Sequence, residues 1–190
     1  MSNPAGLRPQ PKPSRAGCDA KSRLKLHLLA GASGFSYGSS GGFHRSFLLA
    51  IAGGCLCRAV RFEISADAPL GARYCWCRVC QYLGAGTGAV SALFRKEDVA
   101  VSGPLTDYVC QADSGATMHR RFCARCGTDV FSEAEERPQF IFVRAGTLDD
   151  PNLASPTATI WTRSAPEWAC FDLDLPQVEG QPPPPPLATR

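Results

Sequence analysis

The chain has 190 residues, of which 44% are hydrophobic and 19% are charged, and its formal net charge at pH 7 is +3. This length and composition suit one globular domain with its own core, and the lack of any run of about 18 apolar residues excludes a membrane-spanning helix. The charge is uneven, because residues 1–50 hold seven basic residues against one acidic residue (+6) and residues 51–190 hold 13 against 16 (−3). The acidic balance of the larger part argues against a nucleic-acid surface that depends on net positive charge.

Residues 1–50 predict a disordered leader. The stretch 1–17 is rich in Pro, Ser and basic residues, and 31–42 is rich in Gly and Ser. Neither composition can bury enough apolar surface to offset the entropy of the chain. A basic, Ser-rich and nearly acid-free leader is also typical of an organelle transit peptide. We favour the alternative that the start site is assigned too far upstream.

The folded domain is predicted over residues 51–178, and short strands dominate it. Apolar and polar residues alternate from Ala59 to Ile64, which is the period of a half-buried strand. Further strands are predicted at 87–94, 99–102, 105–111, 116–122, 129–132 and 140–145, with a single helical turn at 95–98 and a loop at 146–151. No segment has a long 3.6-residue period, so the fold class is mainly β. Residues 179–190 include five consecutive prolines and predict a disordered proline-rich tail.

Seven of the ten cysteines fall into three close groups. These are Cys55 and Cys57, then Cys75, Cys77 and Cys80, and finally Cys123 and Cys126. Pairs this close make poor disulfide staples, because short loops gain least from closure, but one short turn presents two thiolates well to one metal ion. No credible secretion signal is present, so metal ligation in a reducing cytoplasm is the favoured interpretation.

The spacing favours two zinc ions per chain. Zinc takes four thiolates at a structural site and keeps one position open at a catalytic site. The two distant pairs, Cys55 with Cys57 and Cys123 with Cys126, suit a structural site, and Gly127 can supply the left-handed turn beside it. Three cysteines remain for an open, catalytic site, namely Cys75, Cys77 and Cys80. Zinc held by three thiolates suits an incoming substrate thiol better than a hydrolytic water.

Two alternatives remain open for the three-cysteine group. A second structural site could be completed by Cys110, Cys170 or His119. A redox switch is a weaker alternative.

Four motifs, taken in order, resemble the glutathione-dependent formaldehyde-activating enzyme family, also called the CENP-V/GFA domain, over about residues 51–178. The motifs are Gly53-Gly54-Cys55-x-Cys57, Cys75-x-Cys77-x-x-Cys80, Arg121-x-Cys123-x-x-Cys126-Gly127-Thr128 and Gly146-Thr147-Leu148-Asp149-Asp150-Pro151. The resemblance implies a zinc-held β-tent-type fold of several small antiparallel sheets and the same two-site assignment. It also implies carbon–sulfur lyase chemistry, the formation of S-hydroxymethylglutathione from glutathione and formaldehyde.

The chain departs from the family pattern at four positions. Arg58 stands where Gly is usual, Trp76 where His is common, Gln81 where Arg is frequent, and Thr159 where a His commonly precedes the Ile-Trp pair. All seven ligands are retained, so the departures bear on the substrate and leave zinc binding intact.

The leading hypothesis is a zinc-dependent enzyme acting on a glutathione-like thiol and a small aldehyde. Arg73, Arg78 and Arg163 are candidates for holding substrate carboxylates, because a guanidinium matches a carboxylate in charge and shape. The rival is a non-catalytic, zinc-stabilised module that binds a protein or nucleic acid through the leader or the tail.

Overall fold

The computed structural model describes residues 51–183, so the expectations for residues 1–50 and 184–190 lie outside it. The strands are β1 (Ile51–Gly54), β2 (Arg61–Ile64), β3 (Gly71–Cys75), β4 (Ala89–Arg95), β5 (Val99–Ser102), β6 (Leu105–Gln111), β7 (Thr117–Cys123), β8 (Asp129–Ala134), β9 (Phe140–Arg144), β10 (Thr159–Ile160) and β11 (Gln177–Val178). The helix α1 spans Arg78–Leu83, and 3₁₀ turns occupy Lys96–Asp98, Ala145–Thr147, Pro151–Ala154 and Thr162–Ser164.

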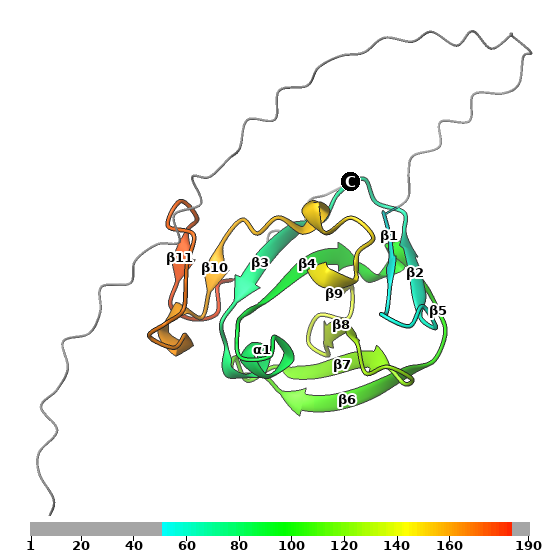
Figure 1. The fold of residues 1–190 in the computed structure, drawn as a ribbon, viewed down its shortest axis with the longest axis horizontal. Coiled ribbons are helices and arrows are strands. Elements are labelled where there is room, and N and C mark those ends of the chain that lie inside the picture. The colour runs from blue at the N-terminus through cyan, green and yellow to red at the C-terminus, as the bar shows by residue number, and fades with distance from the viewer. Residues whose placement is uncertain (1–50, 184–190) are drawn as a thin grey trace, which may run out of the picture.

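The strands form two sheets, which confirms the prediction of a mainly β fold. A small antiparallel sheet has the order β1-β2-β5. The larger sheet has eight strands in the order β11-β10-β3-β4-β9-β8-β7-β6, and Figure 1 shows it curving from β3 and β4 round to β7 and β6. Its strands pair antiparallel except at one edge, where β10 pairs parallel with both β3 and β11. The fold therefore combines a small antiparallel sheet with a larger one that is antiparallel except at its β10 edge.

The main core lies between the two sheets. On β2, Phe62 and Ile64 are buried while Glu63 is exposed, as the alternation predicts. The ring of Phe62 meets the ring of Phe131 on β8 edge-on, with centroids 5.1 Å apart. Both faces of β8 are covered, because every residue from Val130 to Ala134 is buried. This packing holds the small sheet against the concave larger one.

Residues from the C-terminal part of the chain complete the larger sheet. Ile160 and Trp161 are buried, and β11 pairs with β10 beside them. The first residues of the predicted proline-rich tail continue along this edge. Trp161 donates its backbone N–H to Gly180 O (3.3 Å) and its indole N–H to Gln181 (3.2 Å).

Candidate functional site

Four cysteines from two distant loops meet at one end of the small sheet. Cys55 and Cys57 lie in the turn between β1 and β2, while Cys123 ends β7 and Cys126 follows it in a tight turn. Their Sγ atoms all lie within 4.8 Å of one another, with 3.5 Å between Cys55 and Cys57 and 3.8 Å between Cys57 and Cys123. Tetrahedral zinc–thiolate bonds of about 2.3 Å place sulfurs roughly 3.8 Å apart, so this cluster could hold a metal ion.

Hydrogen-bond donors surround these sulfurs. Val60 donates its N–H to Cys55 Sγ (3.2 Å), and Arg125 donates its N–H to Cys123 Sγ (3.4 Å). A hydrogen bond from the Thr128 side chain lowers the pKa of Cys126 to about 5. Gly127 has φ of 71°, which is the left-handed turn that the sequence predicts there. Donors directed at sulfur favour the thiolate form that a metal ion requires.

The other three cysteines surround the start of α1. Cys75 ends β3, Cys77 is the N-cap of α1, and Cys80 lies in its first turn, with its N–H directed at Cys77 Sγ (3.5 Å). The three Sγ atoms lie within 4.8 Å of one another, so this cluster could also hold a metal ion. The helix α1 was not predicted, since a helix of six residues is too short to display a hydrophobic period.

The three-cysteine cluster has no fourth protein ligand within residues 51–183. Cys110 lies free and half-buried on β6, and His119 on β7 is held by Asp107 and Glu135 instead. Cys170 is also absent from the cluster. Within the described part of the chain, the arrangement therefore favours an open site over a saturated one.

The three thiols interact strongly with one another. Hydrogen bonds from Cys75 and Cys77, helped by the charges of Arg144 and Arg120, lower the pKa of Cys80 to about 3. The same contacts raise the pKa of Cys75 far above its usual range, because a second negative charge would stand beside the first. Full deprotonation of the cluster therefore requires a cation among the three sulfurs.

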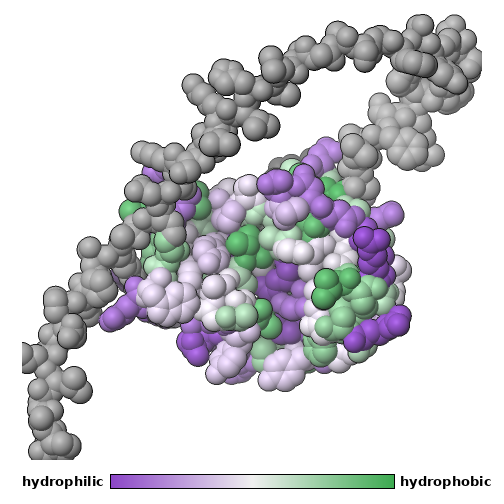
Figure 2. All heavy atoms as spheres, in the orientation of Figure 1, coloured by the Kyte–Doolittle hydropathy of each residue, from purple (hydrophilic) through white to green (hydrophobic). Residues whose placement is uncertain are grey.

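A cavity opens above these three cysteines, and none of the four other clustered cysteines lines it. The space at this site is about 700 Å³ when the open mouth is included, and the centre of a water-sized molecule can occupy about 100 Å³ of it. Figure 2 shows hydrophilic residues at the bottom of a hollow near the middle of the visible face. Four arginines line the cavity, namely Arg73, Arg120, Arg137 and Arg144, against one carboxylate, Asp113. The cavity is therefore suited to an anionic ligand.

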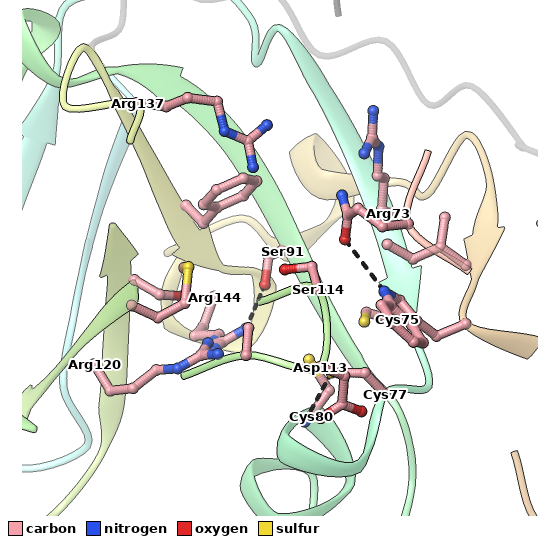
Figure 3. A pocket seen from close by; sticks show the side chains of 17 residues that line it. Arg73, Cys75, Cys77, Cys80, Ser91, Asp113, Ser114, Arg120, Arg137 and Arg144 are labelled. Carbon is pink, nitrogen blue, oxygen red and sulfur yellow. Dashed lines mark hydrogen bonds between the residues drawn. The ribbon is translucent and has the colours of Figure 1, made fainter. Parts of the chain in front are cut away.

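Arg120 and Arg144 are the most enclosed of these arginines, with exposures of 7% and 8%. Arg144 is fixed by an ion pair with Asp129 and donates from Nη1 to Ser91 Oγ (2.6 Å), while its Nη2 has no protein acceptor. Arg120 Nε likewise lacks a partner, and Arg120 forms no ion pair within residues 51–183. Figure 3 shows both side chains reaching into the cavity from the side opposite the cysteines. Buried donors without acceptors are costly, so they indicate a place for a ligand oxygen.

Of the three arginines that the sequence offers as carboxylate ligands, only Arg73 lines the cavity. Arg78 stacks on Tyr82 and Arg163 stacks on Trp161, and neither lines the cavity. The other cavity arginines, Arg120, Arg137 and Arg144, were not predicted. For Arg120 a signal existed, since it alternates along β7 in phase with Met118 and so occupies an inward position on a half-buried strand.

Two of the residues that depart from the family pattern, Trp76 and Gln81, pack around the site and do not line the cavity. Trp76 is 1% exposed and packs against Tyr74, Trp168 and Phe171, not in the cavity. Gln81 is buried and donates to Trp76 O (2.7 Å) and Ser164 O (2.9 Å), which ties the cysteine loop to the C-terminal part of the chain.

The other two departures lie in the turn between β1 and β2 and on β10 at the parallel edge of the larger sheet. Arg58 has φ of 60°, the left-handed conformation that favours glycine. Thr159 is fully buried on β10 and is outside the cavity wall. The four departures therefore change packing and backbone strain, and none of these side chains lines the cavity.

Among residues 51–183, no helix is long and apolar enough to cross a membrane.

Several known proteins are similar to this chain in sequence. The sequence model of the family described as GFA, glutathione-dependent formaldehyde-activating enzyme, matches residues 50–164. A Halomonas elongata protein, provisionally named a glutathione-dependent formaldehyde-activating enzyme, is 26% identical over 121 residues, covering 61% of this chain and 77% of that protein. The crystal structure of a Rhodobacter sphaeroides protein is 28% identical, covers 52% of this chain and 87% of that chain, and has a TM-score of 0.41. The chain belongs to the GFA family.

Proposed function

We propose that this chain binds two zinc ions and catalyses carbon–sulfur bond formation between a glutathione-like thiol and a small aldehyde such as formaldehyde. The observation that carries the proposal is the three-cysteine cluster at the base of a cavity lined by four arginines. In the four-cysteine cluster, Cys55, Cys57, Cys123 and Cys126 would hold a structural zinc. Cys75, Cys77 and Cys80 would hold the catalytic zinc and leave one position open.

When bound, zinc would supply a soft Lewis acid that favours the thiolate form of the substrate near neutral pH. The protein residues position the substrates around that thiolate. Asp113 accepts the backbone N–H of Arg78 (2.9 Å), which fixes the β6–β7 turn against the cysteine loop. Arg144 is held in place by Asp129 and Ser91. The reacting groups therefore meet between fixed side chains.

The unpartnered N–H groups of Arg120 and Arg144 suit the charge that develops on the aldehyde oxygen. As the sulfur–carbon bond forms, the electron pair of the carbonyl π bond moves to oxygen. That oxygen then takes up a proton, which replaces the one that the thiol released. Thiol and aldehyde combine without any other reactant, and the reverse sequence splits the adduct.

The proposal requires a reducing compartment, and the cytoplasm is the one we expect. Seven cysteines must stay as thiols to bind zinc, and glutathione-like thiols are abundant where the environment is reducing.

Exchange spectroscopy with ¹³C-formaldehyde tests the proposal, since it measures the rate at which formaldehyde and glutathione exchange with their adduct. We expect the zinc-loaded protein to accelerate this exchange well above the spontaneous rate. Cys80→Ala should abolish the acceleration, while Cys110→Ala, which changes a free cysteine outside the cavity, should retain it. Unchanged acceleration by Cys80→Ala would refute the catalytic assignment.

A further inference from the structure

A second chamber adjoins the cavity of the proposed active site. It encloses about 700 Å³ including its mouth, and its wall shares Arg73, Ser91, Arg137 and Phe142 with the first cavity. The rest of its lining is mostly apolar and includes Leu70, Leu93 and Phe140. No cysteine lines it. The two chambers therefore meet at a pair of arginines, with the three cysteines on one side and apolar walls on the other.

The two arginines at this junction come from separate elements. Arg73 lies on β3, and Arg137 lies in the turn between β8 and β9. Both side chains are half-buried and both line the two chambers (Figure 3). Burial, followed by the positive charge of Arg137, lowers the pKa of Arg73. Two like charges in a partly dry wall repel each other, so the unliganded junction is electrostatically unfavourable.

No carboxylate within residues 51–183 pairs with either arginine. The side chain of Arg73 meets only a carbonyl, Pro183 O at 3.4 Å, and Arg137 has no side-chain partner in this part of the chain. Other arginines outside the cavity behave differently, since Arg61 pairs with Asp149 and Arg121 pairs with Glu133. The exposed carboxylate of Glu136 acts on Arg137 only through space, so the junction keeps two positive charges that no salt bridge within residues 51–183 offsets.

We propose that Arg73 and Arg137 bind a carboxylate, and that the second chamber holds the apolar chain next to it. This inference rests on the proposed function and deepens it by naming the substrate class: an elongated, carboxylate-bearing compound that extends from the three cysteines into the second chamber. Formaldehyde has no carboxylate, so the group belongs either to the thiol or to a larger aldehyde. Both sources share the same recognition chemistry, a carboxylate on an apolar chain.

A binding experiment without any thiol tests the site independently of catalysis. Hexanoate and the uncharged 1-hexanol are titrated into the zinc-loaded full chain, and binding is followed by NMR. We expect hexanoate to bind about 10- to 100-fold more tightly than 1-hexanol, and Arg73→Gln and Arg137→Gln each to remove that advantage. Arg61→Gln, which removes a positive charge outside both chambers, should leave hexanoate binding unchanged.

Equal binding of the two probes, or unchanged hexanoate binding in both variants, would overturn the proposal. Cys80→Ala separates this result from the proposed function, because it disables the cysteine cluster and leaves the arginine junction intact. Hexanoate binding by Cys80→Ala would support the junction even if the wild-type chain accelerated no reaction. Its loss in Cys80→Ala would show that the carboxylate binds at the cysteines and would reject the site at Arg73 and Arg137.

Kinetic measurements distinguish the two sources of the carboxylate. One arm compares 2-(2-mercaptoethyl)octanoate, whose carboxylate stands between the thiol and an apolar chain, with its uncharged methyl ester, using formaldehyde as the partner. The other compares 2-(2-oxoethyl)octanoate with its methyl ester, using 2-mercaptoethanol as the partner. Arg73→Gln should lower kcat/KM about tenfold or more for the carboxylate-bearing member of one arm and leave its uncharged counterpart unchanged. The arm that shows this selective loss identifies whether the carboxylate belongs to the thiol or to the aldehyde. If neither arm shows it, the proposed substrate class is wrong.

Discussion

The Sγ atoms of Cys57 and Cys123 lie 3.8 Å apart although 66 residues separate them in sequence. Cys57 belongs to the turn of the small sheet and Cys123 ends a strand of the larger one. A metal ion between them would join the two sheets, and the binding energy of such a site is folding energy. The three-cysteine cluster, by contrast, joins residues that are at most five positions apart.

Removing one cysteine from each cluster should therefore have different consequences. Cys123→Ser should lower the melting temperature sharply or prevent folding, because apparent binding energies of structural zinc are on the order of 10 kcal/mol. Cys80→Ser should reduce bound zinc from two ions to one and leave a folded chain. Elemental analysis of zinc per chain, combined with circular dichroism melts, measures both effects. Equal loss of stability in the two variants would contradict the division into structural and catalytic sites.

Arg120→Gln should reduce catalysis without removing zinc. Loss of a preorganised donor to a developing oxyanion typically costs about 10²- to 10³-fold in kcat, and Arg120 Nε is a buried donor that lacks a protein acceptor. Arg121→Gln is the matched control, since Arg121 is adjacent in sequence, pairs with Glu133 and does not line the cavity. The measurement is exchange between formaldehyde and its glutathione adduct, together with zinc content. Equal effects of the two substitutions would count against the role of Arg120.

Gly53→Ala should destabilise the fold, because Gly53 of the first cysteine motif packs against Thr147 of the 146–151 motif. A Cβ at Gly53 would lie 2.2 Å from the ring of Phe62 and 2.3 Å from Thr147 O, so the backbone or the ring would have to move. Overpacking of this kind costs about 1–3 kcal/mol. Gly146→Ala is the control, because its Cβ would meet no atom within 4 Å. Urea denaturation gives both free energies of unfolding, and a stability for Gly53→Ala equal to that of the control would disprove the steric argument.

Arg58→Gly should stabilise the chain. Arg58 has φ of 60°, and a side chain in this conformation costs about 1–2 kcal/mol, while glycine loses about 0.5–1 kcal/mol through added freedom of the unfolded chain. We expect a gain of about 0.5–1 kcal/mol in the free energy of unfolding. Arg58→Ala retains a Cβ and should give no such gain. A gain in the alanine variant would attribute the effect to the lost guanidinium and not to backbone strain.

Stability should also depend on pH through His119. Hydrogen bonds to Asp107 and then Glu135 raise the pKa of His119 above its ordinary value of 6.5. Because the folded pKa lies above the unfolded one, this contribution to stability is complete below about pH 6.5 and is lost as pH rises through the raised pKa of the folded state.

NMR titration of the His119 ring measures that raised pKa directly. Asp107→Asn should bring it back toward 6.5, and His119→Gln should remove this component from a plot of melting temperature against pH. A His119 pKa that is the same with and without Asp107 would show that the carboxylate does not control the titration.

Local sequence patterns were enough to predict seven of the eleven strands among residues 51–183, and the cysteine groups. Alternation between Ala59 and Ile64 reflects a strand with one buried face, and it appears in the structure as β2. The C-x-C and C-x-x-C spacings fix which thiols can meet one ion, because one turn of backbone presents both. The strands β1, β3, β10 and β11 were not predicted. In β10 and β11, two residues are too few to display a period.

The sequence determined where thiols cluster, and the tertiary structure decided what surrounds them. Arg73, Arg120, Arg137 and Arg144 are spread over 72 positions of the chain, yet all line the cavity beside the cysteines. Apart from the alternation that places Arg120 inward on β7, no local pattern distinguishes them from Arg78 or Arg163, which stack on surrounding aromatic rings. The physical reason is that close thiols chelate through local backbone geometry, whereas a charged cavity depends on sheet curvature and strand order, which bring distant side chains to one place.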